Sequence, residues 1–275
     1  MESVLIISPQ AGMGNRLRAL CSALVLGEVC GRKVYHTWYD EALTSRLPRV
    51  KDMQQIGFGG LFEELVPRWT GEKVVEQCFS EWLPGTFWHR SQSSGQQRFA
   101  AGVTPVAIGE DACQIIESTV PVILLETSLV VKILSSTDWE SRMTSAYQRY
   151  FSPLPLYRMQ VPTVDVGISV RRGELLQYYP EARQDLLAVA AWLVPLVRDK
   201  QAILFSDDVI VRERLRTVLR LDLSLKESGL QDWERAFVEF LTLATCNEVY
   251  GTPASSFAKE AAAFGGKPYI PLREV

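Results

Sequence analysis

The chain has 275 residues, of which 47% are hydrophobic and 22% charged, a balance that fits one large globular domain or two small ones. A formal net charge of −3 argues against nucleic acid as the main partner. The five cysteines show no CxxC spacing and the chain has two histidines, so the sequence predicts neither a disulfide scaffold nor a metal site. The N-terminus is acidic where a secretion signal would be basic, and the longest apolar stretch is shorter than the roughly 20 residues of a bilayer span, so we expect a cytoplasmic protein without a membrane span.

The first 40 residues predict a βαβ unit. Apolar residues 4–8 indicate a strand, the turn 9–14 contains two glycines, and apolar residues then recur at helical spacing until a second strand at 32–38. The pattern is unclear from 39 to 99. Beyond it the sequence predicts strands at 120–125 and 129–133 and a polar helix at 136–150.

Three prolines at positions 153, 155 and 162 indicate a linker, after which strands and helices alternate more regularly. This alternation is typical of a parallel sheet with helices on both faces. The expected strands are 164–170, 202–206, 221–225, 248–250 and 268–270, and the expected helices are 182–194, 209–219, 233–244 and 256–264.

The segment 164–174 is the most informative part of the sequence. A run of apolar and β-branched residues ends in Arg171 and Arg172, followed by a glycine. Open α/β sheets bind ligands at the carboxyl ends of their strands, and a guanidinium group offers a fixed fork of donors that suits phosphate. The alternative interpretation is a strand whose charged end meets solvent.

A second candidate site lies where the first strand meets its helix, at Gly12, Gly14, Asn15 and Arg16. Glycines let a backbone approach a ligand closely, and the N-terminus of a helix attracts anions. The sequence fingerprint of a nicotinamide-binding site would need a third glycine at the position of Leu17. The hypothesis of a nicotinamide-dependent oxidoreductase therefore depends on the two glycines alone. We expect the Asn15 and Arg16 side chains to face the crevice at this turn, where they could contact a ligand. The alternative is a tight turn that has a packing role and binds no ligand.

Two further strand ends carry polar side chains. Asp208 follows the strand 202–206 and is expected to cap the next helix, whereas Asp207 is left open between capping and ligand binding. Ser255 and Ser256 lie at the start of the helix 256–264, where they offer hydroxyls and backbone N–H groups to an anion and also serve as N-caps. Together with the arginine pair, these ends predict a phosphate-binding crevice.

Four segments, 12–20, 166–174, 205–208 and 255–257, resemble in this order the α1,6-fucosyltransferases, including the rhizobial nodulation enzyme, and the protein O-fucosyltransferases. The resemblance implies an α/β fold of two facing Rossmann-like domains (GT-B type), with an acceptor-side domain at 1–160 and a nucleotide-sugar-binding domain at 161–275. It also implies a metal-independent, inverting transfer of L-fucose from GDP-fucose to a hydroxyl of a glycan, a protein or a small molecule, without a cofactor.

The resemblance further implies roles for individual residues. Arg171 would contact the β-phosphate of the donor, Ser255 and Ser256 would lie near the pyrophosphate, and Glu239 would recognise guanine. Asn15 matches a position near the acceptor in the protein O-fucosyltransferases. The remaining donor-binding candidates are Gly12, Gly14, Arg16, Arg172 and Asp207.

The sequence departs from the family pattern at two positions. Ser169 stands where the family usually has histidine, and Glu174 where it often has aspartate. The missing histidine keeps open a related GDP-sugar as the donor, and also a non-catalytic nucleotide- or phosphate-binding domain of the same fold. The acceptor also stays open, and aromatic residues such as Trp38 either stack on sugar rings or pack in the core.

Overall fold

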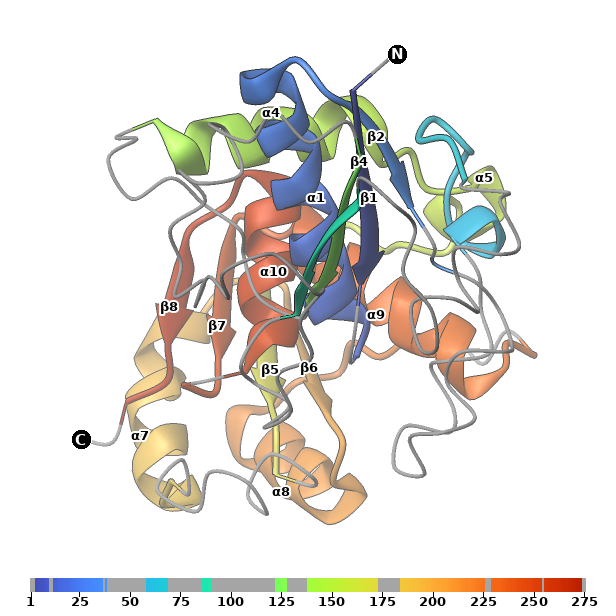
Figure 1. The fold of residues 1–275 in the computed structure, drawn as a ribbon. Coiled ribbons are helices and arrows are strands. Elements are labelled where there is room, and N and C mark those ends of the chain that lie inside the picture. Colours follow the sequence, from blue (N-terminus) through green and yellow to red (C-terminus); the bar gives the residue numbers. More distant parts are fainter. Residues whose placement is uncertain are drawn as a thin grey trace. The chain divides into compact units, whose positions relative to one another are not determined.

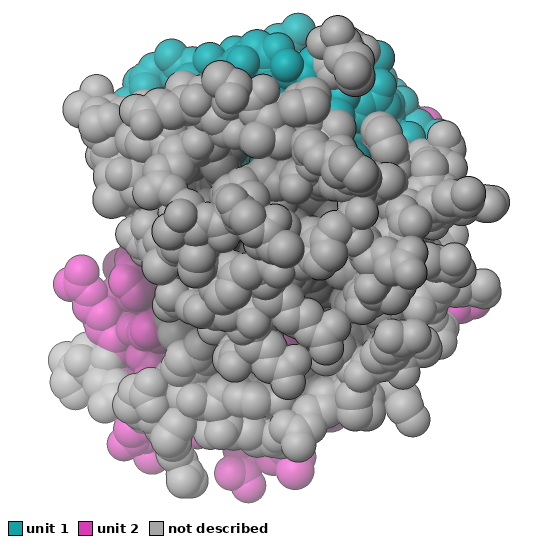
Figure 2. All heavy atoms as spheres, viewed as in Figure 1, with its two compact units in different colours: residues 1–153 teal, residues 154–275 magenta. Residues whose placement is uncertain are grey.

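The protein is described by a computed structural model (Figure 1). The described residues are 3–9, 12–36, 38, 58–68, 86–90, 122–127, 138–172, 184–225, 229–253 and 255–273. The expected strand at 129–133 and the position of Glu174 lie outside these ranges. The chain divides into two compact units, unit 1 at residues 1–153 and unit 2 at residues 154–275 (Figure 2).

Unit 1 contains a parallel four-stranded sheet in the order β2-β1-β4-β3. Residues 4–7 of its central strand β1 are apolar, and Leu5, Ile6 and Ile7 are fully buried. The strands are β1 (Val4–Pro9), β2 (Lys33–His36), β3 (Thr86–Arg90) and β4 (Val122–Thr127). The first, second and fourth of these are near the expected positions, whereas β3 was not predicted from the sequence.

Helix α1 (Met13–Cys30) connects β1 to β2, as the sequence predicts. It begins after Gly12 and ends at Gly31, which adopts the left-handed conformation with φ of 63°. Gly14, expected in the turn, instead lies in the first turn of the helix. The helix α4 (Trp139–Tyr150) packs against α1, and the short η1 (Phe58–Gly60) completes the described elements of this unit. None of the helices in the described ranges combines the length and the apolar character that crossing a bilayer requires.

Unit 2 contains a second parallel sheet in the order β6-β5-β7-β8. Its strands are β5 (Val166–Val170), β6 (Ala202–Ser206), β7 (Glu248–Gly251) and β8 (Tyr269–Pro271). Its helices are α5 (Pro155–Arg158), α7 (Leu186–Val197), α8 (Val209–Leu219), α9 (Asp232–Thr245) and α10 (Ser256–Gly265). The strand expected at 221–225 is wrong, because in this segment only Leu223 forms an isolated bridge, to Ile203.

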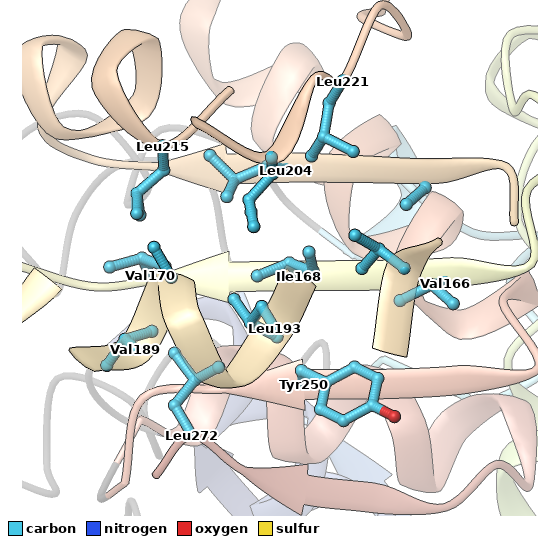
Figure 3. Packing of buried hydrophobic residues seen from close by; sticks show 14 of the residues in the cluster. Val166, Ile168, Val170, Val189, Leu193, Leu204, Leu215, Leu221, Tyr250 and Leu272 are labelled. Atoms are coloured by element: carbon cyan, nitrogen blue, oxygen red, sulfur yellow. The ribbon is translucent and has the colours of Figure 1, made fainter. Parts of the chain in front are cut away.

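The two faces of β5 explain why helices cover both sides of this sheet. Val166, Ile168 and Val170 point to one face, where they pack into an apolar cluster with side chains of α7 and α8 (Figure 3). Gly167 points to the other face, where an added Cβ would lie 2.7 Å from Leu243 Cδ2 of α9. The α/β architecture with parallel sheets is therefore confirmed.

The strand order shows a reversal of winding in each unit. In unit 2 the chain leaves the central β5 for β6 on one side and later adds β7 on the other, so the direction of winding reverses between β5 and β7. Ligands of open α/β sheets bind outside the carboxyl ends of the strands at such a reversal. Arg171 and Thr252 immediately follow these two strands. In unit 1 the same reversal lies between β1 and β4, and Gly12 follows β1.

Candidate functional site

The segments that follow β5 and β7 are joined through Thr252. Its backbone N–H donates to the carbonyl of Ser169 at 3.1 Å, and its hydroxyl oxygen accepts a hydrogen bond from the Arg171 backbone N–H at 2.9 Å. The hydroxyl of Tyr269 donates to the Thr252 carbonyl at 3.0 Å. Thr252 is 2% exposed, so these bonds are shielded from water and fix the backbone at Arg171.

The guanidinium of Arg171 is oriented by a carboxylate and an aromatic ring. Its Nε lies 3.4 Å from Asp207 Oδ2, and its Cζ lies 6.0 Å from the centre of the Phe257 ring. Among the described residues, the two terminal nitrogens of this guanidinium have no hydrogen-bond partner. With the side chain 36% exposed, these nitrogens are available as a donor fork for an anion.

Hydrogen bonds also hold the two residues next to the Arg171 guanidinium, Asp207 and Arg172. Asp207 Oδ1 accepts a hydrogen bond from the backbone N–H of Arg172 at 2.7 Å, while the Arg172 guanidinium donates to the carbonyl of Gln184. Gln184 in turn donates from its side chain to the Leu272 carbonyl at 2.8 Å. The side chain of Arg172 therefore links backbone segments of unit 2. Asp208 Oδ1 accepts hydrogen bonds from the N–H groups of Ile210 and Val211, which confirms its predicted role as the N-cap of α8.

Glu239 lies on α9 in an environment of arginines. Burial raises the pKa of its carboxyl to about 7, and the positive charges of Arg212, Arg235 and Arg171 oppose this rise. The influence of Arg171 means that Glu239 and the donor fork share one local electrostatic field. A carboxyl whose pKa is raised by burial and that interacts with the charge of the donor fork is a candidate ligand-binding group.

The first turn of α10 completes the described surroundings of Arg171. Ser255 occupies the N-cap position and is 5% exposed, but its side chain makes no capping hydrogen bond. The predicted position is right and the predicted bond is absent. The backbone N–H of Ser255 donates to the Thr252 carbonyl, and Ser256 begins the helix. This leaves the N-terminus of α10 without capping by the Ser255 hydroxyl, beside the ring of Phe257.

The candidates from the first glycine turn belong to unit 1. Gly12 has an extended conformation, and a Cβ added there would meet nothing within 4 Å. The Arg16 side chain is buried, with its Cζ 5.5 Å from the Trp38 ring centre, and burial lowers its pKa to about 10. Asn15 is half-buried, and its Oδ1 is a buried acceptor without a hydrogen-bond partner in the described part of the chain.

The structure thus groups Arg171, Asp207, Glu239 and Ser255 in unit 2. Thr252 and Phe257 were not singled out from the sequence, although Phe257 lies in the segment 255–257 on which the resemblance depends. Their signal was position alone, directly after a strand and at the start of a helix. Within the described ranges, no group of three or more histidine, cysteine, aspartate or glutamate side chains is arranged to hold a metal ion.

Two parallel α/β sheets, one with an arginine at its reversal of winding, fit a GT-B-like glycosyltransferase fold, and comparison with solved structures supports a fucosyltransferase-like fold. POFUT1 in complex with GDP-fucose has a TM-score of 0.59 at 10% identity, covering 100% of this chain and 98% of the other. NodZ α-1,6-fucosyltransferase soaked with GDP-fucose has a TM-score of 0.58 at 16% identity, covering 96% and 93%. An Arabidopsis thaliana FUT1 variant in complex with GDP has a TM-score of 0.60 at 13% identity, covering 100% and 71%.

The resemblance seen in the sequence motifs is therefore confirmed at the level of the fold. Comparison of the sequence with protein-family models and with curated proteins gives no match. Identities of 10–17% to the solved structures carry information on the fold, and residue roles have to be argued from the site itself.

Proposed function

We propose that the protein is a metal-independent, inverting glycosyltransferase that uses GDP-fucose as its donor and a hydroxyl of a glycan, a protein or a small molecule as its acceptor. One observation carries the proposal: the donor fork of Arg171 lies at the reversal point of the unit 2 sheet, oriented by Asp207 and Thr252. In this proposal unit 2 is the donor-binding domain and unit 1, with Asn15, is the acceptor-side domain.

The donor is bound by groups of unit 2. Arg171 contacts the β-phosphate, and the first turn of α10, with Ser255 and Ser256, contributes N–H groups and a favourable helix dipole to the diphosphate. The Glu239 carboxylate accepts hydrogen bonds from N1–H and the amino group of guanine. The solved structures of POFUT1 and NodZ with GDP-fucose support this choice of donor.

The chemistry requires stabilisation of the leaving group. Cleavage of the bond between C1 of the sugar and the diphosphate oxygen builds negative charge on that oxygen, while the acceptor hydroxyl attacks C1 from the opposite face. The hydroxyl loses its proton to solvent, and GDP is the leaving group. A prearranged guanidinium and a helix N-terminus stabilise this charge without a metal ion. Removal of one such donor costs about 3 kcal/mol, or roughly a hundredfold or more in rate.

Calorimetry with GDP and GDP-fucose in the presence of a chelator tests the proposal. We expect both ligands to bind with dissociation constants below the millimolar range and without added metal. Transfer is then measured by mass spectrometry against a panel of glycans, peptides and small alcohols. Absence of binding at millimolar nucleotide, or binding that requires a divalent cation, would overturn the proposal.

The second candidate is a non-catalytic nucleotide- or phosphate-binding domain of the same fold. The observation that favours it is Ser169, which is 2% exposed and stands at the strand position where the resembling family usually has histidine. Tight binding of GDP with no transfer to any acceptor in the panel would select this candidate.

A further inference from the structure

The ring of Tyr269 lies against the carboxyl end of β7 in unit 2. Tyr269 begins the edge strand β8, which pairs with β7 (Figure 1). A Cβ added at Gly251, the last residue of β7, would lie 2.8 Å from Cε2 of this ring and 2.7 Å from Ala258 Cβ of α10. Because position 251 carries no side chain, the Tyr269 ring and α10 can both approach the end of the strand.

The hydroxyl of Tyr269 joins two consecutive carbonyls at this strand end. It donates to the Gly251 carbonyl at 3.2 Å and to the Thr252 carbonyl at 3.0 Å, so one proton is shared between two acceptors. Burial raises the pKa of Tyr269 to about 12, and the hydroxyl therefore keeps this proton at neutral pH. The Gly251 carbonyl also accepts from the N–H of Leu272. The Thr252 carbonyl also accepts from the N–H of Ser255.

Thr252 connects the Tyr269 hydroxyl to two groups that are proposed to contact the diphosphate. The Thr252 hydroxyl oxygen accepts the backbone N–H of Arg171 at 2.9 Å. The Thr252 carbonyl accepts the N–H of Ser255, which is the N-cap of α10. A shift of Thr252 would therefore move the backbone at Arg171 and the first turn of α10 together, and the Tyr269 hydroxyl opposes such a shift.

We propose that Tyr269 is a positioning residue of the donor site, which acts through Thr252 to hold Arg171 and the first turn of α10 in place for one diphosphate. The role in transfer rests on the proposed function, whereas the link from Tyr269 to Arg171 does not. Donor groups stabilise a transition state only when they are held in place, and a displacement of about 1 Å can cost a hundredfold in rate. Loss of one of several bonds that hold them should cost less, about fivefold.

Amide hydrogen exchange at Arg171, measured by NMR on the full chain, tests the link without any ligand. Tyr269→Phe removes the hydroxyl but keeps the ring, and both carbonyls retain another donor, so we expect a melting temperature within about 5 °C of the wild type. The Arg171 backbone N–H should exchange about fivefold faster in this variant. It should exchange faster still in Thr252→Val, which lacks the acceptor. Tyr250→Phe is the matched control, because its hydroxyl in the same strand donates to Glu248, and it should exchange at the wild-type rate.

Steady-state kinetics with GDP-fucose test the role in transfer. We expect Tyr269→Phe to lower kcat about fivefold with a smaller change in KM, because the charge on the leaving oxygen develops in the transition state. Thr252→Ser keeps the hydroxyl and should retain most of the rate that Thr252→Val loses. When Tyr269→Phe is added to Thr252→Val, kcat should fall by less than about twofold, since two residues of one network are not additive. Tyr250→Phe should react as the wild type does.

Several outcomes would overturn the inference while the proposed function stands. They are wild-type exchange at Arg171 in Tyr269→Phe, a wild-type kcat in that variant, the full loss of kcat when it is added to Thr252→Val, and equal changes in Tyr250→Phe. A melting temperature of Tyr269→Phe far below the expected range would show a role in folding and would also overturn it. A wild-type protein that neither binds GDP nor transfers fucose overturns the proposed function, and with it the positioning role, even where the exchange rates are as expected.

Discussion

Asp207 and Arg171 form an ion pair in which the carboxylate approaches the guanidinium from its Nε side, at 3.4 Å. The same carboxylate accepts the Arg172 backbone N–H through its other oxygen. Exposed pairs of this kind contribute only about 0–1 kcal/mol to folding, so we interpret the pair as an orienting contact. It turns the terminal nitrogens of Arg171 away from Asp207 and so leaves them available to an anionic ligand.

Replacement of Arg171 tests the donor fork directly. We expect Arg171→Ala to lower the transfer rate roughly a hundredfold or more and to weaken GDP binding, because the charge on the leaving diphosphate loses its main donor. Arg171→Lys should recover only part of the loss, since lysine lacks the planar fork. Steady-state kinetics and calorimetry measure both effects. Arg149→Ala removes an exposed arginine that pairs with Glu28 and should leave both values unchanged; equal losses in the two alanine variants would contradict the assignment.

Variants of the two neighbouring aspartates should show that Asp207 orients Arg171 whereas Asp208 stabilises the fold. Asp207→Asn keeps an acceptor for the Arg172 N–H but removes the charge that holds Arg171, and we expect transfer to fall about tenfold with little change in stability. Asp208→Ala removes two hydrogen bonds at the start of α8 and should cost about 1 kcal/mol of unfolding free energy while GDP binding is retained. Urea denaturation and calorimetry of both variants make the comparison. A loss of stability in Asp207→Asn together with a loss of GDP binding in Asp208→Ala would instead show that Asp207 has a structural role and Asp208 a binding role.

Donor binding should depend on pH through Glu239. Guanine recognition needs the carboxylate form, so affinity is complete above the pKa of about 7 and declines as the pH falls through it. Each pH unit below that value should lower the affinity about tenfold. GDP-fucose is the suitable ligand, because its diphosphate is esterified at both ends and does not titrate near neutrality. Glu239→Gln should bind weakly with a flat profile between pH 6 and about 8; a flat wild-type profile would remove Glu239 from the base site.

The elements that the sequence predicted well are those determined by local pattern. Helix α8 was expected at 209–219 and is found at Val209–Leu219, because apolar residues at helical spacing and an aspartate at the N-cap are neighbours in the chain. Strand β3 was missed because the short segment Thr86–Arg90 is a strand only by pairing with β4, more than thirty residues later. The apolar residues at 221–225 resemble a strand, yet only Leu223 reaches a neighbour.

The same distinction holds for the candidate site. The arginine pair was visible because charge directly after a buried strand is unusual. The sequence could not separate the two arginines, since Arg171 meets Asp207 and Phe257 whereas Arg172 donates to the Gln184 carbonyl, and these partners are distant in the chain. Thr252 was overlooked because its importance lies in a backbone contact to Arg171 across the sheet.

Gly265, the last residue of α10, lies so close to α9 that an added methyl group should disturb the packing of the two helices. A Cβ at this position would lie 1.8 Å from the Ala244 carbonyl oxygen, a backbone atom that cannot move without shifting the whole of α9. We expect Gly265→Ala to lower the unfolding free energy by about 3 kcal/mol, the upper part of the range for overpacked cores. Gly12→Ala is the matched control, because its Cβ would meet nothing within 4 Å, and it should cost less than about 1 kcal/mol as an N-cap change. Equal denaturation midpoints of the two variants in urea would show that α9 and α10 are not packed as closely as described.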